Sequence, residues 1–183
     1  MNTAALRLVC PKIAPTDKSE AELFGAMVWL WMHSHVHRAC PVRELERLLL
    51  PAVKTGQFVL ALGNDVLQQP AGLMTWASFD VATEQRYLQS LDRTLQPSDW
   101  QAGDRPWILD YVVPFGHVHE MARATQRLLP HSLWRTLHHR GDALGLRVLH
   151  FKGSKVSKAQ ETAFWAHRPL ADPRACRRGV HSA

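Results

Sequence analysis

One apolar stretch, Pro106-Trp-Ile-Leu-Asp-Tyr-Val-Val113, constrains the fold of this chain more than any other segment. Its residues are apolar on both sides except for one carboxylate, Asp110, which is the pattern of a buried strand. A carboxylate there costs free energy unless it is paired or hydrogen-bonded. The stretch therefore predicts a strand inside a sheet, with Asp110 either holding a loop backbone or orienting a histidine.

The rest of the chain alternates between helical and strand patterns. Ser19-Glu-Ala-Glu22 has the spacing of a capping box before an apolar helical repeat. Helices are predicted over 20–33, 41–49, 80–91 and 120–129, and further strands over 57–62, 71–77, 133–138 and 146–151. This order of elements predicts one mixed α/β or α+β domain. We place that domain at 19–168, between a flexible N-terminal segment (1–18) and a flexible basic tail (169–183).

Length and charge narrow the possible roles. The 183 residues suffice for one core, and the net charge of +6 favours acidic partners. No nucleic-acid-binding motif is present, no apolar run approaches the ~18–20 residues of a membrane span, and the N-terminus lacks a signal-peptide pattern. We expect a cytoplasmic protein. The three widely spaced cysteines, Cys10, Cys40 and Cys176, argue against disulfides and against a thiolate zinc site.

Three histidines, His33, His35 and His37, alternate in Met-His-Ser-His-Val-His-Arg. In a strand they would share one face and form half of a metal site, for which His117 and His119 are further candidate ligands. In a helix only the first and third would share a face. The run is also compatible with a polar helix end, or with one catalytic base oriented by a carboxylate. We predict no bound metal.

Five motifs, taken in order, carry a resemblance to a known family. They are W-L-W-M-x-S-x-x-H-R at 29–38, L-P-A at 50–52, P-A-G-L-M-T-W-A at 70–77, D-W-x-x-G-D-R-x-W at 99–107 and D-Y-V-V-P-F-G at 110–116. In this order and spacing they resemble the RTX toxin-activating lysine acyltransferases of the HlyC type. The resemblance covers residues 24–153. It implies a single GNAT-like domain, with a mixed central sheet flanked by helices.

The resemblance also implies a reaction. Members of this family move a fatty acyl group from acyl carrier protein to the ε-amino group of internal lysines in a protoxin. It implies that His37 and Asp110 are catalytic, and that Ser34 matches the family's serine. The chain departs from the family at His35, where proline is common, and at Tyr111, where tryptophan is usual. A small peptide or another amine as substrate, or a non-catalytic GNAT-like binding module, stays open.

The donor is expected to be a protein-borne thioester, with no tightly bound cofactor. Coenzyme A-using relatives of this fold hold the pyrophosphate with a glycine-rich loop at a helix start, and the segment after Pro114 has no such loop. Candidate substrate-binding residues are Trp76 and Met74 for the acyl chain, with Arg38 and Arg105 as basic contacts. For Arg105 the alternative is an ion pair next to a plain turn. The resemblance also makes a homodimer possible.

Overall fold

The computed structural model describes residues 6–64, 66–90, 93–140 and 143–172 and divides into two compact units. The first unit comprises Met1–Trp76 and Asp110–Leu128, and the second comprises Ala77–Leu109 and Leu129–Ala183. Cys176 and most of the predicted basic tail lie outside the described residues. The same is true of 141–142, within the connection predicted between the last two strands.

The first unit contains four strands, or parts of strands, and four helices among its described residues. They are β1 (Arg7–Val9), α1 (Glu20–Met32), α2 (Val42–Leu48), α3 (Leu50–Thr55), β2 (Phe58–Leu62), most of β3 (Pro70–Phe79), the end of β4 (Arg105–Val112) and α5 (Val118–Leu128). The predicted capping box is confirmed, because the Ser19 side chain accepts from the Glu22 backbone and Glu22 accepts from the Ser19 backbone.

The second unit carries the remaining elements. They are the end of β3, α4 (Val81–Gln89), the 3₁₀ turn η1 (Pro97–Trp100), the start of β4, β5 (Leu133–Arg140), β6 (Ala143–Lys152) and α6 (Lys158–Ala166). Asp80 begins α4 by accepting a hydrogen bond from the Thr83 backbone, and Ser157 begins α6 with a capping box.

The strands follow the order β1-β2-β3-β4-β5-β6. Strands β1 to β3 pair antiparallel, β4 pairs parallel with β5, and β5 pairs antiparallel with β6. The sheet is therefore mixed and accompanied by helices, which confirms the predicted α/β class. Four short elements were absent from the sequence prediction: β1, which lies in the segment predicted to be flexible, α3, η1 and α6.

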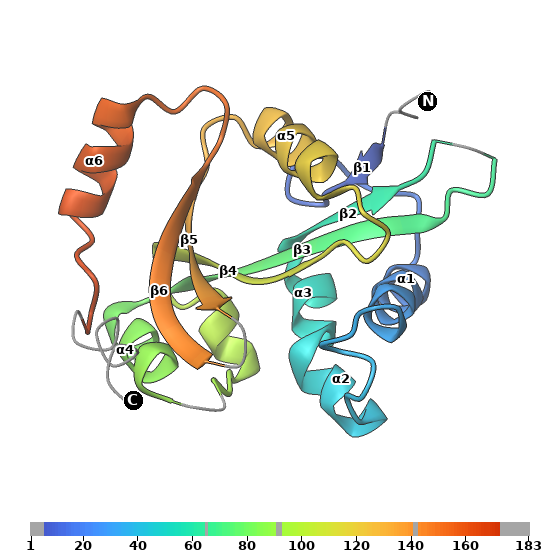
Figure 1. Cartoon of the computed structure of the whole chain (residues 1–183), viewed down its shortest axis with the longest axis horizontal. Helices are drawn as coiled ribbons and strands as arrows, with labels where there is room; N and C mark the ends of the chain where they lie inside the picture. The colour runs from blue at the N-terminus through green and yellow to red at the C-terminus, as the bar shows by residue number, and fades with distance from the viewer. Residues whose placement is uncertain (1–5, 65, 91–92, 141–142, 173–183) are drawn as a thin grey trace. The chain divides into compact units, whose positions relative to one another are not determined.

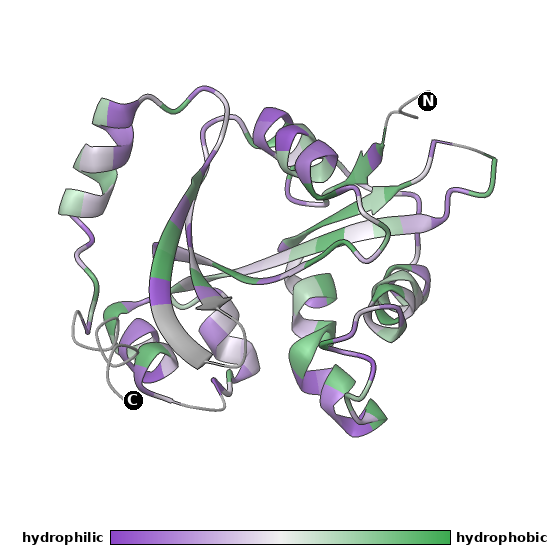
Figure 2. Ribbon diagram, in the orientation of Figure 1, coloured by the Kyte–Doolittle hydropathy of each residue, from purple (hydrophilic) through white to green (hydrophobic). Residues whose placement is uncertain are grey.

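The core of the first unit forms around β2 and β3. Every residue of β2 is buried, and Figure 1 shows α1, α2 and α3 on one side of these strands and α5 on the other. Figure 2 shows β2 as hydrophobic and most of α5 as hydrophilic, so α5 covers the sheet with a narrow apolar stripe. Gly72 permits this packing, because a Cβ there would lie 2.4 Å from the Met121 sulfur.

The core of the second unit contains a buried carboxylate, Glu84, on α4. Its side chain is fully buried and accepts hydrogen bonds from Arg105 at 2.6 Å, Arg135 at 2.7 Å and the Trp107 indole at 2.8 Å. The Ala171 backbone donates a further bond at 3.0 Å. The two guanidinium groups also donate to the carbonyls of Pro169 and Arg168. A single acidic side chain thus ties α4, β4 and β5 to the segment after α6.

No helix among the described residues is both long enough and apolar enough to cross a bilayer.

Replacing Glu84 with glutamine is expected to destabilise the second unit strongly. The change leaves two buried guanidinium groups without a compensating charge, a loss on the order of 3–5 kcal/mol in the free energy of unfolding. Denaturant unfolding followed by tryptophan fluorescence measures it. The control is Glu46→Gln, since Glu46 is an exposed helical glutamate on α2. Equal midpoints for the two variants would contradict the proposed role of Glu84.

Candidate active site

Successive turns after α1 bring Ser34 and His37 together. The Ser34 backbone N–H donates to the Trp31 carbonyl, and the His37 N–H donates to the Ser34 carbonyl at 3.2 Å. This i to i+3 turn brings the Ser34 Oγ within 2.9 Å of His37 Nδ1. Both side chains are half-buried. The spacing S-x-x-H therefore allows this contact, because a tight turn places residues three positions apart next to each other.

Asp110, on β4, meets the same histidine from the other edge of the ring. Its Oδ1 lies 3.4 Å from His37 Nε2, and its Oδ2 accepts a hydrogen bond of 2.9 Å from the Trp31 indole. The side chains of His37 and Asp110 are 21% and 18% exposed, so the pair is largely shielded from solvent but still accessible to it. Trp31 also stacks on the His37 ring, with centroids 4.5 Å apart and planes 27° from parallel. All four residues belong to the first unit.

Burial raises the pKa of the Asp110 carboxyl above its ordinary value. The His37 imidazolium, the Trp31 N–H and the Tyr111 backbone N–H act in the opposite direction, since each favours the charged form. The net direction remains upward because desolvation is the largest effect. A partly desolvated carboxylate is stabilised most by a neighbour that becomes positively charged, and His37 is that neighbour.

The contacts also assign the tautomer of His37. An ionised Asp110 can only accept, so the nitrogen facing it, Nε2, carries the proton. Nδ1 then keeps its lone pair and accepts from the Ser34 hydroxyl. The ring is thus arranged as a base whose basic nitrogen faces Ser34 and whose positive charge, once formed, faces a carboxylate.

The other histidines of the run have different surroundings. His33 Nδ1 lies 2.8 Å from the Trp29 carbonyl, so this nitrogen donates and caps the end of α1. His35 is exposed. Residues 33 to 37 form turns rather than a strand, so the three rings do not line one strand face. Within the described ranges, no group of three or more His, Cys, Asp or Glu side chains could hold a metal ion.

Two of the three cysteines lie among the described residues, and both are free thiols. Desolvation raises the pKa of Cys10, which is buried, and of Cys40, which is half-buried. Raised values keep these thiols protonated, so neither has the character of an activated nucleophile.

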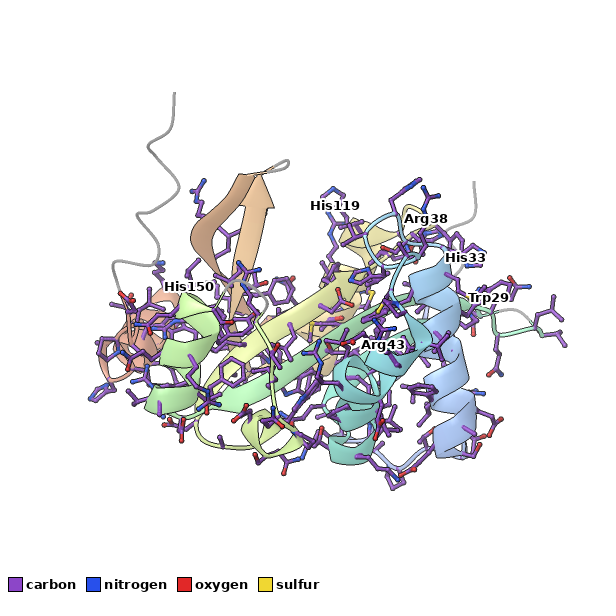
Figure 3. The ribbon with its side chains drawn as sticks, turned by 90° about the horizontal axis from the view of Figure 1, so that it is seen from below. Trp29, His33, Arg38, Arg43, His119 and His150 are labelled. Atoms are coloured by element: carbon purple, nitrogen blue, oxygen red, sulfur yellow. The ribbon has the colours of Figure 1, made fainter. Side chains whose placement is uncertain are left out.

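The candidate substrate-binding residues are not gathered around His37 in the same way. Met74 is fully buried opposite Val59, and Trp76 is 7% exposed, so both are residues of β3 that belong to the hydrophobic core. Arg38 is exposed directly after His37 (Figure 3). Arg105 belongs to the second unit, where it pairs with Glu84 as the alternative ion-pair interpretation anticipated. Substrate binding by these four residues stays a prediction.

Sequence reasoning missed two features of this region. Trp31 is buried, as a core residue would be, but it also contacts Asp110 and His37; its place three positions before Ser34 was the signal available. An exposed aromatic row was also missed: His33 lies 4.5 Å from the Trp29 ring and 5.2 Å from the Phe115 ring. Trp29 and Phe115 are 44% and 46% exposed. Figure 3 shows Trp29 and His33 at the end of α1.

Comparison with known proteins shows the family to which the chain is similar. The model of the HlyC family, described as the RTX toxin acyltransferase family, matches residues 16–152. A leukotoxin-activating lysine-acyltransferase of Mannheimia haemolytica is 32% identical over 144 residues, which cover 78% of this chain and 83% of that protein. A protein-lysine palmitoyltransferase of Bordetella bronchiseptica is 35% identical over 151 residues, covering 81% and 78%.

The RTX-I toxin-activating lysine-acyltransferase of Actinobacillus pleuropneumoniae is 31% identical over 137 residues, covering 75% of this chain and 77% of that protein. The family match spans the loop with Ser34 and His37 as well as the strand with Asp110. The motif-based resemblance is therefore confirmed: the chain belongs to the RTX toxin acyltransferase family.

Proposed function

We propose that this protein transfers a fatty acyl group from acyl carrier protein to the ε-amino group of internal lysines of an RTX protoxin. The observation that carries the proposal is the contact series Ser34–His37–Asp110, which joins a hydroxyl, a base and a carboxylate within 2.9 and 3.4 Å. The relatives' names include lysine acyltransferases that activate leukotoxins and an RTX-I toxin, and one protein-lysine palmitoyltransferase.

The proposed reaction requires a base because a lysine side chain is almost wholly protonated at neutral pH, with a reference pKa near ~10.4. The ammonium group loses two protons in becoming an amide: one passes to solvent to give the neutral amine, and His37 Nδ1 accepts the other as the amine attacks, while Asp110 stabilises the imidazolium that results. The amine nitrogen attacks the thioester carbonyl carbon, the new C–N bond forms and the C–S bond breaks. His37 then returns the proton to the leaving phosphopantetheine thiolate.

Ser34 stands in front of the basic nitrogen, which leaves two routes. In the first, Ser34 passes the proton of the lysine to His37 and the amine attacks directly. In the second, His37 deprotonates Ser34, whose oxygen takes the acyl group as an ester before the lysine removes it. Both routes use the same contact between Ser34 and His37.

Charge and apolar surface support the choice of substrates. The net charge of +6 suits an acidic carrier protein, and Arg38 is an exposed cation directly after the base. Large apolar side chains are exposed on the segments before and after His37 and Asp110 in the sequence. In the first unit they include Trp29, Met32, Val36, Val42, Phe115 and Val118. Exposed apolar side chains of this kind suit an acyl chain or a protein partner.

Replacing His37 with alanine is expected to lower kcat by about 10²- to 10⁴-fold, the usual contribution of a positioned general base. The assay combines the protein, a panel of acyl carrier protein thioesters and an inactive RTX protoxin, and intact mass reports the acyl group added to lysine. Coenzyme A thioesters of the same chain length test whether the carrier protein is required.

His35→Ala is the matched control, since His35 is an exposed histidine two positions away. It is expected to keep near wild-type activity. Transfer that is indifferent to His37, or absent with every thioester, would remove the catalytic assignment and favour a non-catalytic binding module. Transfer only to short peptides or small amines would replace the protoxin as substrate.

Asp110→Asn is expected to reduce activity and, at neutral pH, to raise the free energy of unfolding. The folded-state pKa of Asp110 is raised, so its ionisation costs stability as pH rises from the unfolded value near ~3.9 through the folded value. Asparagine has no such cost. Thermal unfolding from pH 3 to 8 measures it, and a stability difference that shrinks as pH rises would contradict the burial argument.

Ser34→Ala distinguishes the two routes. If Ser34 carries the acyl group, wild-type enzyme mixed with donor alone gains one acyl mass on the peptide containing Ser34, and the alanine variant gains none. If Ser34 only relays a proton, neither protein is acylated without acceptor, and the variant keeps slow direct transfer. Peptide mass mapping after rapid acid quenching decides between them.

A further inference from the structure

Trp31 contacts both members of the His37–Asp110 pair with one side chain. Its indole nitrogen donates to Asp110 Oδ2 at 2.9 Å, and its ring face stacks on His37 at a centroid distance of 4.5 Å. We propose that Trp31 is a positioning residue of the catalytic pair, an inference that rests on the function proposed above.

The backbone of Trp31 is well placed to hold a fixed position. It lies in the last turn of α1, whose buried side is formed by Leu23, Met27, Leu30 and Trp31 itself. Trp31 is only 6% exposed, so its ring has little freedom to change rotamer. Because α1 fixes the Trp31 ring, the ring in turn restricts the positions of the groups it contacts.

The indole N–H orients the carboxylate. A carboxyl group on a short side chain can rotate about its terminal bond, because that torsion has only broad preferences. With Oδ2 engaged by Trp31, the second oxygen, Oδ1, faces His37 Nε2. The same hydrogen bond favours the ionised form of Asp110, which the reaction needs.

The indole face restricts the imidazole. Ser34 contacts the ring at Nδ1 and Asp110 faces it at Nε2, so both contacts lie along the ring edge. Trp31 covers one face, which limits tilting out of that line. Edge and face contacts together define the ring orientation, and small errors in the orientation of a catalytic base cost large factors in rate.

The test begins with Trp31→Phe, which keeps an aromatic ring but removes the N–H donor. It is expected to lower kcat about 10- to 100-fold with KM nearly unchanged, and to move the acidic limb of the pH–rate profile to higher pH. Trp31→Leu removes the ring face as well and should lower kcat further. Trp100→Phe is the matched control, because Trp100 is 2% exposed and its indole nitrogen has no hydrogen-bond partner among the described residues.

A double-mutant cycle shows whether Trp31 acts through Asp110. In an Asp110→Asn background, Trp31→Phe should change the residual rate less than about twofold, since the charged acceptor is already gone. Full additivity would overturn the proposal. So would normal kcat and a normal pH profile in Trp31→Phe, while loss in that variant matched by Trp100→Phe would assign Trp31 a purely structural role.

A second measurement needs no Trp31 variant and covers the case in which Trp31→Phe fails to fold. The chain has seven tryptophans, so NMR of the wild type shows the indole N–H signals as a small set. One of them is expected to shift in Asp110→Asn and to titrate with the pair, and no shift would overturn the proposal. Loss of activity in His37→Ala with normal activity in Trp31→Phe would reject this inference and leave the proposed function intact.

Discussion

The contacts of one carboxylate, Asp110, organise the candidate active site of the first unit. Asp110 stands in an otherwise apolar strand, where an unpaired charge is costly. Trp31 and His37 are its partners, and they interact with it differently. The Trp31 indole donates a hydrogen bond whatever the pH, whereas the His37 imidazole can take up a proton and form an ion pair with Asp110. The last turn of α1 and the turns after it place both partners. The site therefore depends on α1 ending at Met32 and on its buried face staying packed.

The second unit contains a carboxylate, Glu84, whose surroundings differ from those of Asp110. Glu84 is fully buried and receives two guanidinium groups, an indole N–H and a backbone N–H, so nothing about it is left to react. Asp110 keeps 18% of its side chain exposed and faces one titratable group. A tryptophan donor accompanies both carboxylates. The number of permanent cations around each carboxylate, rather than burial alone, distinguishes the structural Glu84 from Asp110, for which we propose a catalytic role.

Much of the fold was predictable because the signals were local. The capping box at Ser19, the apolar period of α1 and the strand run 58–62 depend on neighbouring residues, and they appear where the patterns indicate. Strand β1 and helix α6 were missed, since three residues at a sheet edge and a mixed polar helix leave weak patterns. The choice of Ser34, His37 and Asp110 as site residues came from motif resemblance; the structure shows that Ser34 and Asp110 both contact His37, and their catalytic roles are proposals.

The sequence by itself determined most of the elements and the short-range contact of Ser34 with His37, because a separation of three residues is closed by a single turn. Only the tertiary structure decided the partners of the two carboxylates. Trp31 and Asp110 are separated by 79 positions and Arg135 and Glu84 by 51, and no periodic pattern specifies such pairs. The physical reason is that periodicity reports which face of an element is buried, whereas a hydrogen bond to a buried charge depends on how distant elements pack.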